Sequence, residues 1–316
     1  MALARSLFRK GADFTAAMAF EMASTNLVLE LSIIIVALLG WQLTLAEFVG
    51  APLMVVLLVL LFRMFLSREL LEEAKAQADK DVAGRMEGHA EMDMSVPEGG
   101  SLWERMTSDR GFTAISHYFV MDWAAVWMDI VGGLAIAGAL AAWVPNTFWQ
   151  SLFLTGHPVL GTLWGPIVGP LVAVISFVCS VGNIPVAAVL WNGGISFGGV
   201  IAFIFADLII IPILNIYRKY YGLKMASFLF ATFYAAMAAA ALIIDLIFGG
   251  CALIPSERKA RAVEASISWG YTTWLNLFFL VLAGLLVWRF LKTGGPAMLR
   301  MMNRPSDHGL AHDHAH

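Results

Sequence analysis

Long apolar runs separated by short polar stretches dominate the chain. Each run is about 20 residues long, which is the length of α-helix that crosses the hydrocarbon core of a bilayer. Apolar residues make up 59% of the sequence and charged residues only 14%, against about 45–50% and about 25% in a soluble domain. The pattern predicts an all-α polytopic membrane protein with about six transmembrane helices, at residues 14–39, 47–66, 121–143, 198–216, 225–248 and 269–289.

A further apolar stretch, residues 160–195, is rich in glycine and proline. A simple lipid-facing helix does not tolerate so many helix breakers. No Lys or Arg occurs between residues 111 and 217, and basic residues concentrate on the cytoplasmic side of membrane proteins. Both ends of the stretch are therefore expected outside, which predicts a re-entrant hairpin with its turn near Cys179 to Pro185.

Basic residues also set the expected orientation and the domains. They occur near the N-terminus, in the loop 67–117 and in the turn 217–224, which predicts a multi-pass protein of the cell (inner) membrane with both termini cytoplasmic. The expected domains are an N-terminal repeat with two transmembrane helices (1–66), a cytoplasmic acidic loop (67–117), a helix with an outer loop (118–159), a C-terminal repeat with the hairpin and three helices (160–291), and a His-rich cytoplasmic tail (292–316).

Two parts of the chain match when the sequence is shifted by 183 residues. The pattern G-x-x-F-x-x-x-x-A-F-x-x-A begins at Gly11 and again at Gly194 without gaps. The charge pattern runs the first copy from inside to outside and the second from outside to inside, so the copies are inverted, which is a transporter architecture. The register places Met1 opposite Ile184, so we expect the N-terminal repeat to be incomplete, lacking one of two symmetric hairpins.

The sequence lacks the motifs that several classes of enzyme require. The sequence has no phosphate loop, no H-E-x-x-H and no G-x-S-x-G, so the motifs of ATP hydrolysis, zinc proteolysis and hydrolase chemistry are missing. Its formal net charge is −3, which does not suit a nucleic-acid binder. We expect no enzymatic activity, no cofactor and no nucleic-acid partner. The expected partners are the lipid bilayer and a small ion or metalloid substrate, with a homo-oligomer possible.

Two groups of residues carry a family resemblance. The segment Cys179-Ser180-Val181-Gly182-Asn183-Ile184-Pro185, followed by Trp191-Asn192-Gly193-Gly194 and Ala206-Asp207, resembles the C-terminal half of a predicted-permease family that includes organoarsenical (methylarsenite) efflux permeases. Arg9-Lys10-Gly11 and Ala23-Ser24-Thr25-Asn26 resemble its N-terminal half. Members usually carry a similar Cys-Ser element in both halves, and the first is missing here. The resemblance implies a membrane permease and does not by itself imply arsenic.

Candidate translocation residues occur at the hairpin turn and in the two repeats. Gly182 and Pro185 interrupt helical hydrogen bonding, which frees backbone groups to coordinate a solute, and Cys179 adds a soft thiolate ligand. Asp207 is an ionisable residue deep in a span, where such residues are costly and functional. The full set of candidates is Cys179, Ser180, Gly182, Asn183, Pro185, Asp207, Ser24, Thr25, Asn26 and Glu30.

The C-terminal tail could bind a metal. Its histidines are spaced so that several imidazoles can coordinate one Zn²⁺ or Cu²⁺ ion, and both ions accept nitrogen ligands. The candidate ligands are His308, His312, His314 and His316.

Three functions remain open from the sequence. The first is a proton-coupled secondary permease that exports a metal, a metalloid or a thiol-reactive small solute. The second is a permease for a small inorganic or sulfur-containing anion held by freed backbone amides. The third is a non-transporting accessory membrane protein with a metal-binding tail.

Overall fold

The structure is a computed structural model that describes residues 2–79, 101–176, 180–258, 260 and 271–302. The secondary structure of these residues is helical and contains no strand, so the prediction of an all-α protein is confirmed. The chain divides into two compact units. Unit 1 comprises residues 3–82 and 129–264, and unit 2 comprises residues 83–128 and 265–316.

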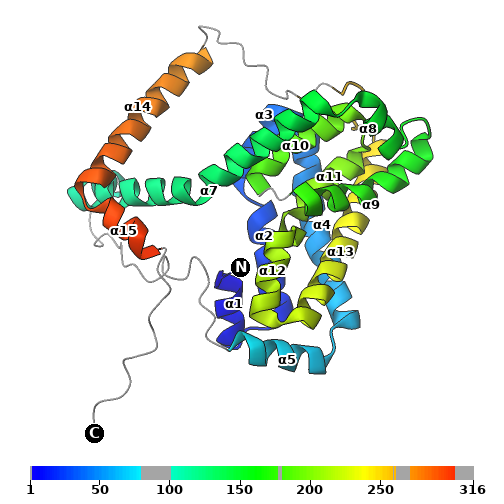
Figure 1. The fold of residues 1–316 in the computed structure, drawn as a ribbon, viewed down its shortest axis with the longest axis horizontal. Helices are drawn as coiled ribbons and strands as arrows, with labels where there is room; N and C mark the ends of the chain where they lie inside the picture. Colours follow the sequence, from blue (N-terminus) through cyan, green and yellow to red (C-terminus); the bar gives the residue numbers. More distant parts are fainter. Residues whose placement is uncertain (1, 80–100, 177–179, 259, 261–270, 303–316) are drawn as a thin grey trace. The chain divides into compact units, whose positions relative to one another are not determined.

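Unit 1 holds most of the helices (Figure 1). They are α1 (Ala2–Arg9), α2 (Phe14–Asn26), α3 (Leu29–Leu39), α4 (Trp41–Phe65), α5 (Arg68–Ala78), α8 (Asn146–Leu152), α9 (Pro158–Ser176), α10 (Ser180–Gly193), α11 (Phe197–Phe205), the 3-10 helix η2 (Ala206–Ile209), α12 (Ile211–Tyr221) and α13 (Leu223–Gly250). The long helix α7 (Asp109–Trp143) contains the predicted segment 121–143 and contributes its second part to this unit.

Several helices are long and apolar enough to cross a membrane. Four qualify alone, namely residues 41–65, 159–176, 223–250 and 273–292. Two bent pairs also qualify, α2 with α3 at 44° and α11–η2 with α12 at 41°. The described residues therefore provide between four and six candidate spans, in agreement with a polytopic membrane protein. The expected helix at 47–66 begins earlier, at Trp41.

The internal repeat seen in the sequence also appears in the backbone. Gly11 and Gly194 both have left-handed φ angles, 99° and 104°. Each is followed by a capping side chain, because Asp13 accepts from the Ala16 N–H and Ser196 accepts from the Gly199 N–H. The helical stretches that follow, 14–26 and 197–209, have the same 183-residue offset. The two copies thus repeat the same local structure: glycine, cap, helix, break.

The two copies run in opposite directions. Their long helices, α4 and α13, pack against each other. A Cβ added at Gly50 would lie 3.2 Å from Ile244, whereas the Phe62 ring is centred 5.3 Å from that of Phe228. Residue numbers therefore rise along α4 as they fall along α13, so these corresponding helices are antiparallel. This geometry agrees with the inverted repeat inferred from charge.

Helices α9 and α10 form a hairpin whose two ends lie together. An added Cβ at Gly193 would lie 3.0 Å from the Trp149 ring, just before α9. At the other end, Ser180 at the start of α10 reaches Asp207 in η2. Helix α10 has 14 residues, about 21 Å at 1.5 Å per residue, and residues 182–184 and 186–191 are buried. Helix α9 alone has the length of a full span.

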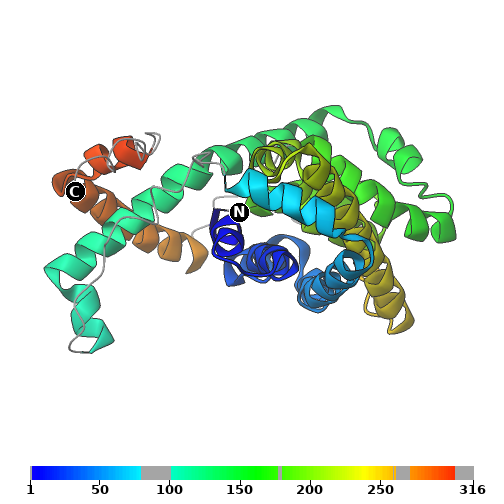
Figure 2. The same cartoon turned by 90° about the horizontal axis from the view of Figure 1, so that it is seen from below.

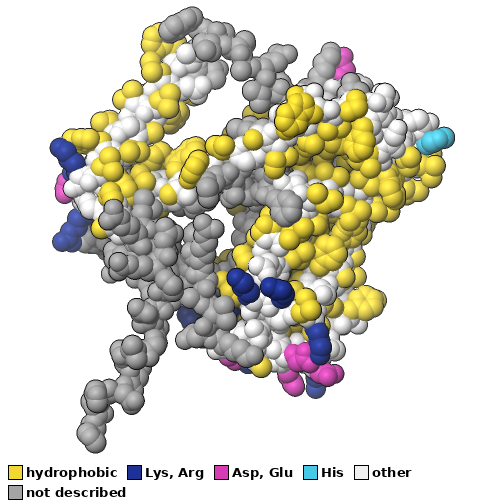
Figure 3. Space-filling view, in the orientation of Figure 1, with side chains coloured by type: hydrophobic (Ala, Val, Ile, Leu, Met, Phe, Trp, Pro, Cys, Tyr) yellow, Lys and Arg dark blue, Asp and Glu magenta, His cyan; other side chains and the backbone are white. Residues whose placement is uncertain are grey.

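Charged side chains gather at the end of unit 1 near α5 (Figure 3). There Lys224 pairs with Glu73 at 2.7 Å and Arg9 with Asp79 at 4.0 Å. Helix α5 lies across this end against α12 and α13 (Figure 2). Apolar side chains cover much of the remaining visible surface of the unit, as a lipid environment requires.

Unit 2 contains α6 (Leu102–Thr107), the first part of α7, α14 (Tyr271–Lys292) and α15 (Gly295–Met302). Ser116 on α7 donates to the Leu286 carbonyl at 2.5 Å. Arg289 on α14 donates to Asp109 and Thr113. These contacts hold α7 and α14 together within the unit.

Candidate functional site

The breaks in the two bent pairs bring polar side chains into an apolar core. Helix α2 ends at Asn26, and the chain turns at Leu27 and Val28 before α3 begins. In the second copy, α11 passes into η2, which carries Asp207, before α12 begins. Asn26 and Asp207 are 1% and 5% exposed. Half-helices that meet inside a membrane protein leave backbone and side-chain groups free to bind a solute or ion.

Of the two carboxyl oxygens of Asp207, one has a hydrogen-bond partner among the described residues and the other has none. Its Oδ2 accepts a hydrogen bond of 2.7 Å from the Ser180 hydroxyl. Its Oδ1 has no hydrogen-bond partner among the described residues. The Asp207 carboxyl also interacts electrostatically with the carboxyls of Glu21 and Glu47. We call Glu21, Glu47 and Asp207 the carboxyl cluster.

The other two members of the carboxyl cluster come from the first copy. Glu21 on α2 is 2% exposed and accepts a 3.0 Å hydrogen bond from the Tyr217 hydroxyl on α12. Glu47 on α4 is 1% exposed, and neither carboxyl oxygen has a hydrogen-bond partner in the described part of the chain. The carboxyl cluster thus joins both repeats.

Helix α10 supplies candidate residues from its first two turns. Gly182, Asn183 and Pro185 lie in one continuous helix that begins at Ser180, so the expected turn does not extend to Pro185. The proline lacks only its own N–H, which frees the carbonyl four residues earlier. Asn183 is fully buried, and its side-chain amide has no partner among the described residues.

The remaining candidates of the first copy differ in their surroundings. The Ser24 and Thr25 hydroxyls donate to carbonyls of their own helix, at 2.9 Å to Glu21 and 3.1 Å to Met22. The Asn26 amide does the same, and its Oδ1 has no partner among the residues described. Glu30 is exposed at the start of α3. Glu21, which was not among the candidates, is the buried acid of this region.

Several candidates fall outside the described residues. They are Cys179 and the four tail residues His308, His312, His314 and His316. Within the described residues, no group of three or more His, Cys, Asp or Glu side chains is arranged to hold a metal ion.

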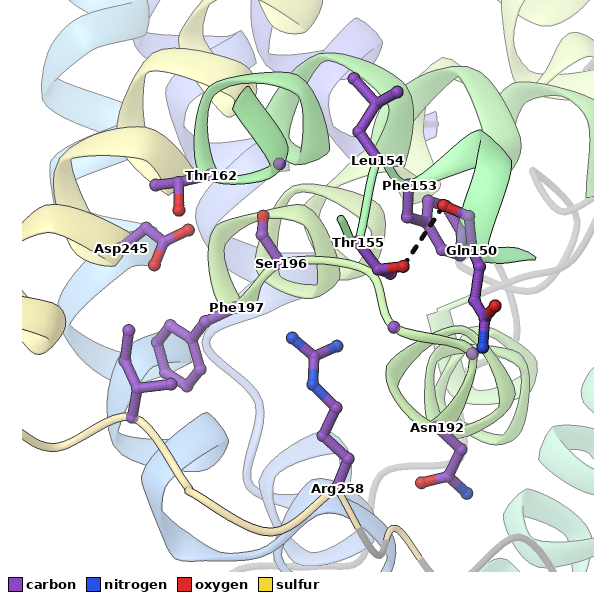
Figure 4. Close-up of a pocket in the computed structure, with 14 residues that line it drawn as sticks. Gln150, Phe153, Leu154, Thr155, Thr162, Asn192, Ser196, Phe197, Asp245 and Arg258 are labelled. Atoms are coloured by element: carbon purple, nitrogen blue, oxygen red, sulfur yellow. Dashed lines mark hydrogen bonds between the residues drawn. The ribbon is translucent and has the colours of Figure 1, made fainter. Parts of the chain in front are cut away.

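A pocket of about 510 Å³ lies at the open end of the hairpin (Figure 4). Arg258 points from its loop toward Ser196, while Asp245 and Thr162 lie on the other side of the pocket. Asp245 accepts from the Gly198 N–H at 2.9 Å and so caps α11. Gln150 and Asn192 add amide groups to the lining.

Arg258 links the loop after α13 to the end of α10 through a hydrogen bond and a cation–π contact. Its guanidinium donates to the Ile195 carbonyl at 2.6 Å and lies 4.5 Å from the centre of the Trp191 ring. Burial lowers the pKa of Arg258 from its ordinary value, and the Asp245 carboxylate opposes this shift. The pocket lining therefore combines the basic side chain of Arg258 with the acidic side chain of Asp245.

Sequence reasoning missed Glu47, Tyr217 and Arg258 as parts of polar sites. Glu47 was placed at the first residue of an expected span, where a carboxylate would be solvated. The available signal was its position six residues inside the apolar segment that follows Gly40. Tyr217 gave no signal of its own, because its partner Glu21 is 196 residues away in sequence.

Comparisons with known proteins give one consistent result. A family model described as "Predicted permease" matches residues 1–246. The chain is 61% identical over 314 residues to "Putative permease Rv2963" of Mycobacterium tuberculosis, an alignment that covers 99% of this chain and 77% of that relative. No solved structure matches the chain.

Proposed function

Because the chain belongs to the family described as "Predicted permease", we propose that it is a proton-coupled secondary permease that exports a metal, a metalloid or a thiol-reactive small solute. In this proposal the protein lies in the cell (inner) membrane with both termini cytoplasmic, and the solute crosses at the interface between the two inverted repeats.

The carboxyl cluster is the observation that carries the proposal. Ionisable groups inside a membrane protein are costly, and they usually mark ion pathways or proton relays. Here three carboxyls from α2, α4 and η2 are 1–5% exposed within the core of the unit. The cluster lies beside the helix breaks, where inverted-repeat transporters bind their solutes and ions.

The hairpin supports a route that alternates between the two sides. Its inner end meets the broken span at Asp207, through the Ser180 hydroxyl. Its open end adjoins the pocket that contains Arg258. A re-entrant hairpin that rocks against the other repeat would expose Asp207 to one side and then to the other, as alternating access requires.

The acidic interior favours a cation, or a neutral solute exchanged for protons, over a free anion. An anion at the carboxyl cluster would meet like charges in a medium of low dielectric constant, which costs several kcal/mol at about 4 Å separation. A soft cargo is suggested by Cys179, whose sulfur is a ligand for thiophilic metals and metalloids. We propose that the cargo binds at Asp207 in exchange for a proton.

Transport by everted vesicles tests this function. Vesicles containing the protein are offered a panel of metal cations, metalloids, organometalloids and small anions, with and without an imposed pH gradient. Asp207→Asn keeps the size and hydrogen bonding but cannot titrate, so proton-driven accumulation should stop while downhill exchange persists. Glu72→Gln, an exposed carboxyl on α5, is the matched control. An Asp207→Asn protein that still builds a gradient with unchanged pH dependence would contradict the proposal.

Arg258 favours one alternative, a permease for a small inorganic or sulfur-containing anion. The guanidinium, the Ser196 hydroxyl and two side-chain amides line the pocket at the open end of the hairpin, and such donors bind oxyanions. The same flux panel decides between the two cargoes, because only this alternative predicts that anions move and metal cations do not. An accessory protein that does not transport would move none of the panel alone.

A further inference from the structure

Glu47 is a buried carboxyl that the proposed role of Asp207 leaves unexplained. It lies on the buried stripe of α4 that also contains Gly50, Ala51 and Met54. A Cβ added at Gly50 would touch Phe205, two residues before Asp207. The stripe therefore points Glu47 toward the junction of α11 and η2, which agrees with its electrostatic interaction with Asp207.

Glu47 has no compensation for a negative charge. Both of its carboxyl oxygens are buried and have no hydrogen-bond partner in the described part of the chain. An ionised carboxylate in such a place would be strongly unfavourable, because it would be buried without a hydrogen bond or an opposite charge, whereas a protonated carboxyl is neutral. The environment therefore selects the protonated form of Glu47.

The helices packed against α4 supply no cation to Glu47. These are α2, α3, α11 and α13. Their charged or titratable groups are Glu21, Glu30, Lys224, Tyr234 and Asp245. Of these, Lys224 pairs with Glu73 at the far end, Tyr234 donates to the Ile167 carbonyl, and Asp245 caps α11. Glu30 is exposed and Glu21 takes the Tyr217 hydroxyl.

Asp207 differs from Glu47 because one of its carboxyl oxygens accepts a hydrogen bond, which favours the negative charge on Asp207 rather than on Glu47. It accepts a hydrogen bond from the Ser180 hydroxyl, and such a donor stabilises the ionised form of a carboxyl. Two nearby carboxyls in a medium of low dielectric constant do not both ionise, because like charges repel strongly there. One proton on Glu47 and one negative charge on Asp207 satisfy both environments.

We propose that Glu47 and Asp207 form a carboxyl pair that holds one proton, resting on Glu47, and that this is the proton exchanged in transport. In each cycle an entering cation displaces this proton to one side of the membrane, and a proton from the other side later replaces the cation, so the pair alternates between one bound proton and none. The inference rests on the proposed function and adds to it a second obligatory residue and the resting position of the proton.

Infrared spectroscopy of the reconstituted protein tests the resting position without any transport. The C=O stretching band of a buried protonated carboxyl is expected near neutral pH in the wild type. It should disappear in Glu47→Gln and remain in Glu72→Gln, the exposed control. A band unchanged in Glu47→Gln would overturn the proposal.

Proton-coupled flux tests the role of the pair. Glutamine copies the neutral form of Glu47 in size, so the variant should fold at wild-type abundance. Its proton-driven accumulation should fall to the equilibrium level while exchange persists, as for Asp207→Asn. Loss of the infrared band with fully retained coupling would overturn the transport role of Glu47. A wild type that moves no member of the panel while showing the band would reject the proposed permease function and leave the protonated Glu47 established.

Discussion

His117 in unit 2 is a titratable residue outside the expected spans. It is 7% exposed, and its ring nitrogens lie 2.7 Å from the Thr293 hydroxyl and 3.1 Å from the Met298 sulfur. Burial lowers the pKa of this ring below its ordinary value of 6.5. The unfolded chain therefore takes up a proton at a higher pH than the folded chain.

The stability of unit 2 should consequently depend on pH through this residue. As pH falls from above 6.5 toward the lowered pKa of His117, the unfolded state gains protons first and stability decreases, with no further loss below that pKa. Thermal unfolding at about pH 8 and about pH 5 measures this change. His117→Gln should show a smaller difference between the two conditions. Equal differences in both proteins would mean that His117 does not contribute.

The sequence could identify a residue of the site only where that residue was unusual in its context, such as an acid within an apolar run or a member of a recognisable motif. Asp207 was visible as an acid deep within an apolar run, and Ser180 as part of the Cys-Ser element. The 2.7 Å hydrogen bond between them was not visible, because it joins residues on separate helices. Glu47 escaped notice because the exposed or buried state of an acid near the end of a span depends on the side that its helix presents to its neighbours.

At the scale of elements, helices α9 and α11 pack closely against each other. Gly169 of α9 faces the backbone of α11, and an added Cβ would clash with the Gly199 carbonyl and lie 3.0 Å from the Phe203 nitrogen. Small residues at such crossings allow helix backbones to approach each other closely in membranes. This contact holds the hairpin against the broken span that carries Asp207.

Gly169→Ala should therefore force the two helices apart. We expect a loss of about 1–3 kcal/mol in stability, as for other overpacked interfaces, measured by thermal unfolding in detergent. Gly284→Ala is the control, since nothing lies within 4 Å of an added Cβ there, and it should be neutral or stabilising by up to about 1 kcal/mol. Equal effects of the two substitutions would mean that α9 and α11 adjust without cost.

At the scale of the whole molecule, the inverted repeat predicts which positions face the same side of the membrane. In unit 1 the open end of the hairpin and the end of α13 lie together, as the contact of Gly198 with Asp245 indicates. His157 and Cys251 are exposed at this end, and Glu72 is exposed at the other, on α5. Residues at opposite ends of antiparallel spans should be accessible from opposite sides.

Thiol labelling with a membrane-impermeant reagent tests this arrangement. In a background with Cys179 replaced by serine, Cys251 and His157→Cys should react from one side of the membrane. In the same background with Cys251 also replaced, Glu72→Cys should react only from the other. Reaction of positions 157 and 72 from the same side would contradict the arrangement of the repeats and the re-entrant hairpin with it.

The sequence by itself determined the class of protein and the plan of its repeats. Long apolar runs must become helices in lipid, since every backbone polar group has to be satisfied within the segment. The left-handed turns at Gly11 and Gly194 are local requirements that a sequence can display, as is the permease resemblance, which the family match over residues 1–246 confirms. Such features need no knowledge of what lies beside them.

Only the tertiary structure decided which polar groups meet. Glu30 was a candidate translocation residue but is exposed, whereas Glu21 was not a candidate and is buried, because burial depends on how α2 and α3 rotate against α4, α10 and α12. The hydrogen bond between Tyr217 and Glu21 likewise joins residues 196 positions apart in sequence. Packing between helices of different repeats sets these relations, and a hydrophobic pattern within one helix carries no information about the side chains that a distant helix presents to it.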